Sequence, residues 1–83
     1  MYEIVFTKNS ENQLKKLDRS VQERIIAVLE RIRIRPEKFV KKLVGESGFK
    51  LRVGDYRVIL DLDNNTLIIL VLKIGHRINI YKN

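Results

Sequence analysis

The chain has 83 residues, 45% of them hydrophobic, which is enough for one compact domain around a single core. Seventeen Lys and Arg against ten Asp and Glu give a net charge of +7, which favours an anionic partner, either nucleic acid or an acidic protein. The absence of cysteine excludes disulfides and cysteine zinc sites, and the single histidine, His76, excludes a multi-histidine metal site and a paired-histidine ribonuclease mechanism.

No segment of the sequence predicts export or membrane insertion. Residues 1–8 lack the basic segment and apolar stretch of a signal peptide, and the apolar run at 67–72 is too short to span a bilayer. Repeats, low-complexity tracts and linkers are also absent from the sequence. We therefore expect a soluble, cytoplasmic protein with one domain over residues 1–83 and no membrane association.

The N-terminal part predicts a strand followed by a short helix. Residues 2–7 alternate between strongly apolar and other side chains, which is the period of a strand. Ser10 and Gln13 fit a capping box at the start of a helix whose apolar side carries Leu14 and Leu17.

A second, longer helix follows the first. Ser20 and Glu23 repeat the capping-box pattern, and Pro36 disfavours helix at Arg35, so the helix should end nearby. Its apolar side consists of residues at helical spacing, namely Val21, Ile25, Leu29 and Ile32. The two helices should form an antiparallel hairpin.

The second half predicts an antiparallel meander, because apolar and polar residues alternate from residue 49 onward. We expect a short strand or extended connection at 41–44, followed by a loop at 45–48. Strands at 49–53 and 56–62 are joined by a turn at 54–55. A turn at 63–66 leads to a central strand covered on both faces at 66–74, and a further strand is expected at 78–81. The predicted fold class is therefore α+β, with an N-terminal strand, a two-helix antiparallel hairpin and an antiparallel meander that forms a small twisted sheet with the helices on one face.

A two-residue turn at 54–55 would place Arg52 directly opposite Arg57, with Lys50 on the same face. Like charges that face each other across a strand pair destabilise a sheet by about 0.2–1 kcal/mol, and a bound anion would offset this repulsion. A solvated basic face, with the long side chains splayed apart, explains the same pattern equally well. The residues alone leave both interpretations open.

The segment Gly75-His76-Arg77 follows the expected central strand. Strict alternation would place Ile74 and His76 on the face of Arg57 and turn Arg77 away, so Arg77 joins this face only if a bulge near Gly75 changes the alternation. His76 by itself is interpreted as a surface or structural histidine rather than a catalytic one, because the sequence offers no second titrating partner.

Residues 49–59 (FKLRVGDYRVI), 73–77 (KIGHR) and Tyr81 together form a pattern that resembles the RelE branch of the RelE/ParE toxin superfamily, and the similarity extends over the whole chain. The resemblance implies a type II toxin that acts as a ribosome-dependent endoribonuclease. Such a toxin cuts mRNA in the ribosomal A site by attack of a ribose 2′-hydroxyl on the adjacent phosphate, without a metal or other cofactor. The resemblance also implies a cognate antitoxin, acidic and partly helical, that neutralises the toxin.

The resemblance further assigns roles to a catalytic set of five residues. Lys50 would favour deprotonation of the 2′-hydroxyl, and Arg52 and Arg57 would hold the phosphate, with Arg57 assisting the leaving oxygen. Arg77 matches another phosphate-stabilising arginine. Tyr81, which from the residues alone could equally be a core-edge aromatic, matches a tyrosine that stacks on a base.

The chain departs from the family pattern at Gly48, where some relatives carry a second lysine two residues before Lys50. Lys41 or Lys42 could take the place of that lysine. We expect Lys41, Lys42 and His76 to bind RNA.

Two other functions remain open. A ParE-like toxin that inhibits DNA gyrase by binding is the main alternative, and a basic nucleic-acid-binding module or an inactivated family member is the third. The catalytic set argues against the gyrase inhibitor, because a protein that only binds has no evident need for these residues on one surface.

Overall fold

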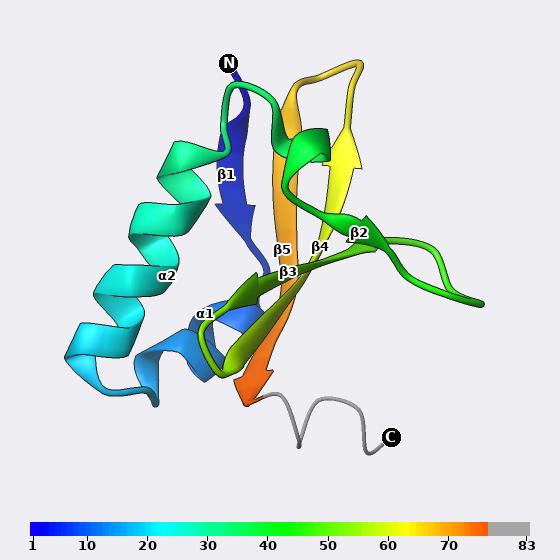
Figure 1. Cartoon of the computed structure of the whole chain (residues 1–83). Helices are drawn as coiled ribbons and strands as arrows, with labels where there is room; N and C mark the ends of the chain where they lie inside the picture. Colours follow the sequence, from blue (N-terminus) through cyan, green and yellow to red (C-terminus); the bar gives the residue numbers. More distant parts are fainter. Residues whose placement is uncertain (77–83) are drawn as a thin grey trace.

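A computed structural model describes residues 1–76 of the chain (Figure 1). Its elements are, in chain order, strand β1 (Glu3–Phe6), helices α1 (Lys8–Lys15) and α2 (Arg19–Arg31), a short 3-10 helix η1 (Pro36–Lys38), and strands β2 (Lys41–Lys42), β3 (Phe49–Val53), β4 (Tyr56–Asp63) and β5 (Ile68–His76). The strands form one five-stranded sheet in the order β1-β5-β4-β3-β2, with β1 parallel to β5 and the other neighbours antiparallel. The predicted α+β class and element order are confirmed, and the strand expected at 78–81 lies outside the described residues.

The start of α1 differs from the prediction. Its N-cap is Thr7, whose side-chain oxygen accepts a hydrogen bond from the Ser10 amide at 3.1 Å. Ser10 is buried inside the helix, where its hydroxyl donates to the Val71 carbonyl at 2.7 Å, and the Gln13 side chain accepts from the Ile74 amide at 2.7 Å. The two residues expected to cap the helix therefore hold α1 against β5, a role that depends on a strand far away in the sequence.

Helix α2 begins at Arg19, with Asp18 rather than Ser20 at the N-cap position, so the second capping box is also wrong. Its buried side is the one predicted from helical spacing, since Ile25, Leu29 and Ile32 are at most 1% exposed. Neither helix of the described residues combines the length and the apolar character that a membrane span needs.

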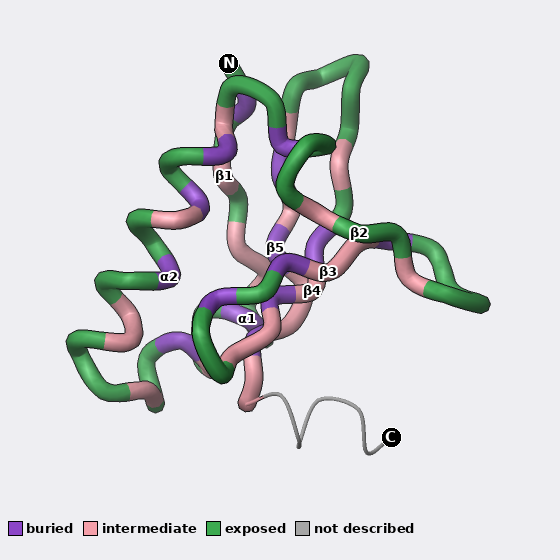
Figure 2. The backbone as a smooth tube through the Cα atoms, in the orientation of Figure 1, coloured by how far each residue is buried: buried purple, intermediate pink, exposed green. Residues whose placement is uncertain are grey.

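Strand β5 lies in the sheet interior between β1 and β4, as predicted, but only one of its faces is fully covered. Ile69 and Val71 are completely buried in the core, whereas Ile68 and Leu70 on the other face stay partly exposed (Figure 2). The expectation of cover on both faces is wrong because the apolar sides of both helices pack into the single core on one face of the sheet.

A bulge in β5 changes which side chains share a face of the sheet. Ile59 of β4 pairs with Lys73, but the next residue of β4 pairs with Val71, so Leu72 is an extra residue on β5. A bulge near Gly75 was one possibility that the sequence left open, and the structure has the bulge at Leu72 instead. From Lys73 to His76, the alternation of inward and outward side chains is therefore inverted.

Because of this inversion, Ile74 and His76 lie on the face opposite to Arg57, which pairs instead with Gly75. Ile74 is buried, and His76 pairs with Tyr56, with the two rings edge to face and their centroids 5.5 Å apart. The placement that strict alternation suggested for Ile74 and His76 is therefore wrong.

Candidate functional site

A pocket on the sheet face away from the helices brings together four cationic side chains. It has a volume of about 320 Å³ and is lined by Phe39, Lys41, Lys50, Arg52 and Arg57. Strands β2, β3 and β4 supply the cations, and Phe39 follows η1 directly. We call this hollow the cationic pocket.

The strand register explains why these cations converge. Lys41 of β2 pairs directly with Lys50 of β3, and Arg52 of β3 pairs directly with Arg57 of β4. Directly paired residues point to the same side of a sheet, so three strands present two facing cation pairs. The opposition of Arg52 and Arg57 predicted from the two-residue turn is confirmed.

The four cations lie at different depths. Lys50 and Arg57 are half-buried, with the Nε atom of Arg57 fully buried, whereas Lys41 and Arg52 are exposed at the rim. The Nε of Arg52 donates to the Gly54 carbonyl at 3.3 Å, which holds this guanidinium near the β3–β4 turn. Since charges interact more strongly where water is partly excluded, an anion seated on Lys50 and Arg57 is bound more tightly than one at the rim.

The chemistry of the lining residues suits a phosphate. Ammonium and guanidinium groups are hydrogen-bond donors that do not coordinate metal ions, and an arginine can grip two phosphate oxygens at once. Among residues 1–76, no group of three or more His, Cys, Asp or Glu side chains is placed to hold a metal ion. The cationic pocket therefore fits an anion such as a nucleic-acid phosphate.

Two of the residues expected to bind RNA do not line the cationic pocket. Lys42 pairs with Phe49 and faces the other side of β2 from Lys41, because successive residues of a strand alternate in direction. His76 lies on the face of Tyr56. Of the two lysines that could replace the one missing from the family pattern, Lys41 is the one in the pocket.

The described residues include only three members of the catalytic set predicted from the resemblance. Lys50, Arg52 and Arg57 line one pocket. Arg77 and Tyr81 lie outside the described residues, and their roles stay predictions.

Phe39 is a lining residue that the sequence analysis missed. It is 52% exposed and stands between η1 and β2. Strand alternation gives no signal for it, because Phe39 has helical backbone angles (φ −115°, ψ −8°) at the end of η1 and precedes β2.

A larger hollow, of about 660 Å³, lies beside the β4–β5 turn and is lined by apolar residues of β1 and β5 and by Asp61 and Asp63. The Thr66 side chain and the amides of Thr66 and Asn65 donate hydrogen bonds to Asp63, which lowers the pKa of its carboxyl below the ordinary value of 3.8. This carboxylate stays ionised at neutral pH and repels phosphate. The larger hollow is therefore not the phosphate site.

The sequence matches the family model of the ParE toxin of type II toxin-antitoxin system, parDE, over residues 4–81. The chain belongs to this toxin family. The superfamily membership expected from residues 49–59 and 73–77 is thereby confirmed. Among curated proteins, none matches the chain significantly.

Several solved toxin structures are similar to this ParE-family chain. A chain of the RelBE2 toxin–antitoxin complex from Mycobacterium tuberculosis is 28% identical, with a TM-score of 0.78 over 92% of this chain and 98% of that one. A chain of the archaeal RelE–RelB complex from Pyrococcus horikoshii is 25% identical, with a TM-score of 0.74 over 92% of this chain and 94% of that one. A chain of the E. coli RelBE complex, 23% identical with a TM-score of 0.75 over 92% and 96% of the two chains, shares the fold.

Proposed function

We propose that this ParE-family chain is a RelE-type toxin that cuts mRNA in the ribosomal A site. The observation that carries the proposal is the cationic pocket, in which two pairs of like charges face each other. Directly opposed like charges repel by about 0.2–1 kcal/mol per pair, and a phosphate bound among these cations would offset the repulsion. The identity of 25–28% to chains of two RelE–RelB-type complexes adds support.

The proposed reaction joins the 2′-oxygen of one ribose to the adjacent phosphorus and breaks the bond from that phosphorus to the 5′-oxygen of the next nucleotide. The 2′-hydroxyl loses its proton to water, the phosphate passes through a five-coordinate transition state with added negative charge, and the 5′-oxygen takes a proton from water. The products are a 2′,3′-cyclic phosphate and a 5′-hydroxyl. The atoms balance without a metal ion or other cofactor.

The residues of the catalytic set divide this work between them. The Lys50 ammonium stabilises the 2′-alkoxide as its proton leaves. Arg57 binds the phosphate from the base of the pocket and donates a hydrogen bond to the leaving oxygen. Arg52 binds the same phosphate from the rim. Arg77 adds positive charge, and Tyr81 stacks on a base and so orients the strand.

Dependence on the ribosome follows from the kind of groups that line the pocket. Ammonium and guanidinium groups stabilise charge better than they abstract protons, so the reaction relies on holding the 2′-oxygen in line with the leaving oxygen. A ribosome that presents the A-site codon in a fixed conformation supplies this alignment. Because ribosomes and mRNA are the proposed targets, we place the action of the toxin in the cytoplasm.

The deciding experiment incubates the purified chain with ribosomes programmed with a defined mRNA and maps the mRNA ends by primer extension. We expect new 5′-hydroxyl ends within the A-site codon for the wild type and their loss in Arg57→Ala. Intact mRNA with the wild-type protein, or full cleavage by Arg57→Ala, would overturn the proposal.

Gyrase inhibition by binding is a second candidate, because the family model that matches the chain is that of ParE. A DNA gyrase supercoiling assay with the same protein preparation separates the two functions. Inhibited supercoiling together with intact mRNA would replace the nuclease with the gyrase inhibitor.

The proposed toxin needs a neutralising partner, and we expect a cognate antitoxin, acidic and partly helical, that either covers the face of Arg52 and Arg57 or displaces the segment around Tyr81. The net charge of +7 attracts such a partner over long range, so its association rate should fall with added salt, while apolar contacts keep its dissociation rate nearly constant. Stopped-flow kinetics over a salt series with the product of the adjacent gene measures both rates. A product that fails to bind, or that binds without suppressing mRNA cleavage, removes the neutralisation model.

A further inference from the structure

Phe39 lies at the cationic pocket although folding gives it little reason to be there. Its side chain is 52% exposed and lies outside the buried core, whereas the next residue, Val40, packs against that core. Phe39 and Lys41 both line the pocket, whereas Val40 between them packs against the core. A ring that stays half exposed outside the core contributes less burial than a core residue, so folding alone does not explain its position beside four cations.

The backbone of Phe39 is fixed by the short helix η1, drawn in green before β2 in Figure 1. The Phe39 amide donates to the Pro36 carbonyl at 3.0 Å, and the Lys38 amide donates to the Arg35 carbonyl at 3.2 Å. Pro36 is fully buried, so the turn is anchored in the protein interior. A backbone held in place before binding loses less conformational entropy when a ligand stacks on the ring that it carries.

We propose that Phe39 forms a nucleobase-stacking subsite beside the cationic pocket. Its ring stacks on an unpaired base of an RNA strand whose phosphate lies among Lys50, Arg52 and Arg57. In single strands, phosphate and base are recognised side by side by a basic groove and an aromatic ring, and every base offers a π face to such a ring. The subsite rests on the proposed function and adds a second stacking residue to Tyr81.

Binding of an RNA that cannot be cleaved tests the subsite directly. The probe is a set of 2′-O-methyl hexanucleotides with 2-aminopurine at each position in turn, in which methylation blocks the attacking hydroxyl and stacking quenches the fluorescence. Phe39→Leu removes the ring but keeps an apolar side chain. Ile34→Ala is the matched control, because Ile34 is 68% exposed and does not line the pocket.

We expect the wild type to bind with quenching at one position of the probe, and Ile34→Ala to behave in the same way. Phe39→Leu should bind about 5- to 150-fold more weakly and without quenching, which is the range that one base–aromatic stack provides. Phe39→Trp keeps the stack, and because the chain has no other tryptophan, quenching of the introduced indole by the RNA reports the contact itself. This second variant decides the matter even if Phe39→Leu does not fold.

The ribosome assay separates this subsite from the nuclease. The subsite is overturned if Phe39→Leu binds the oligonucleotide with unchanged affinity and RNA does not quench the indole of Phe39→Trp. If the wild type still cleaves mRNA in that case, the nuclease assignment stands. If the wild type leaves mRNA intact, the nuclease assignment is overturned. Quenching of the probe that depends on Phe39 supports the subsite even then. A Phe39→Leu variant that loses affinity for the antitoxin and keeps it for the oligonucleotide would identify a protein-docking residue and overturn the subsite.

Discussion

Arg57→Met separates the contribution of Arg57 to function from its contribution to folding. Methionine keeps an unbranched stem that can occupy the place of the half-buried arginine stem, while the charge is removed. The substitution also removes the repulsion between Arg57 and Arg52, which face each other across β3 and β4. Stability and activity should therefore respond differently.

The magnitudes follow from this geometry. Relief of one directly opposed like-charge pair is worth about 0.2–1 kcal/mol, so the free energy of unfolding should rise slightly or stay unchanged. For a domain of this size, 1 kcal/mol corresponds to a melting-temperature change of about 4–8 °C, which sets the upper limit of the expected shift. The cleavage rate should fall by about 100- to 1,000-fold, the usual loss for a donor aimed at developing negative charge.

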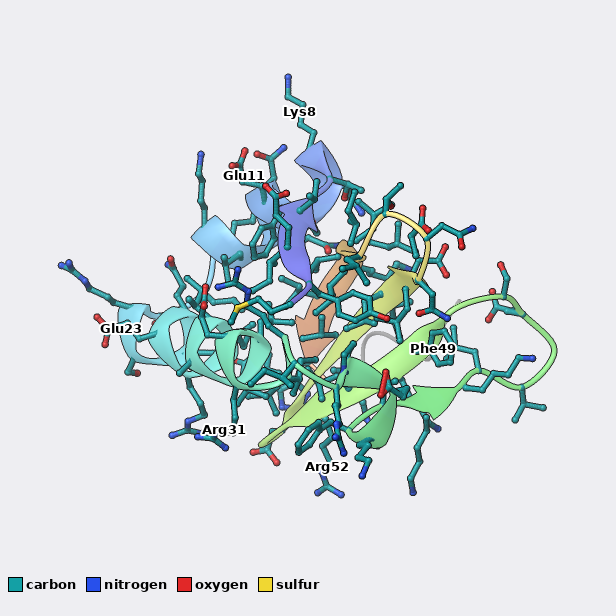
Figure 3. All side chains as sticks on the ribbon, turned by 90° about the horizontal axis from the view of Figure 1, so that it is seen from above. Lys8, Glu11, Glu23, Arg31, Phe49 and Arg52 are labelled. Carbon is teal, nitrogen blue, oxygen red and sulfur yellow. The ribbon has the colours of Figure 1, made fainter. Side chains whose placement is uncertain are left out.

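The assay measures mRNA cleavage on programmed ribosomes and urea unfolding on the same preparations. The control is Lys8→Met, which lowers the net charge equally on the side of the molecule opposite to Arg52 (Figure 3). We expect cleavage by Lys8→Met at the wild-type rate. If Arg57→Met unfolds the protein, or if both variants slow cleavage equally, the cationic pocket is not the phosphate site.

Substitutions at three further positions test other parts of the protein. Ser10→Ala should lower the free energy of unfolding by about 1 kcal/mol, because it removes the hydrogen bond from the Ser10 hydroxyl to a β5 carbonyl. The loss stays this small because the same carbonyl keeps a backbone donor. In urea unfolding, an effect no larger than that of the exposed control Ser47→Ala would contradict this role. Tyr81→Phe should cleave mRNA nearly normally, whereas Tyr81→Ala should lose about the 1–3 kcal/mol of one base stack, and equal losses in both would exclude a purely stacking role. Asp63→Asn removes a carboxylate whose pKa is lowered by hydrogen bonds, chiefly the one from the Thr66 side chain. The Asp63 carboxylate therefore stabilises the fold at pH values above its unfolded pKa, and this contribution is lost as the pH falls through its folded pKa. Thermal unfolding from about pH 5 to pH 2 should therefore show a shallower acid loss in Asp63→Asn than in the wild type, and identical curves would refute the contribution.

Much of the cationic pocket was accessible from the sequence because it depends on short spacings. Alternation placed Lys50 and Arg52 on one face of β3, and a two-residue turn at 54–55 determined that Arg57 lies opposite Arg52. The buried side of α2 likewise followed from helical spacing alone. In each case the residues that decide the outcome lie within a few positions of one another.

Contacts between distant segments decided the rest. Ser10 matches a helix cap locally but bonds to β5, and the bulge at Leu72 arises where β5 pairs with β4, which inverts the side-chain directions in the rest of β5, up to His76. The pairing of Lys41 with Lys50, and with it the place of Phe39 at the pocket, likewise depends on how β2 lies along β3. Periodicity tells which side chains share a face of one element, but it carries no information on which element packs beside it or in which register. The tertiary structure therefore decided which of the chain's many cations meet in one pocket and which aromatic ring stands beside them.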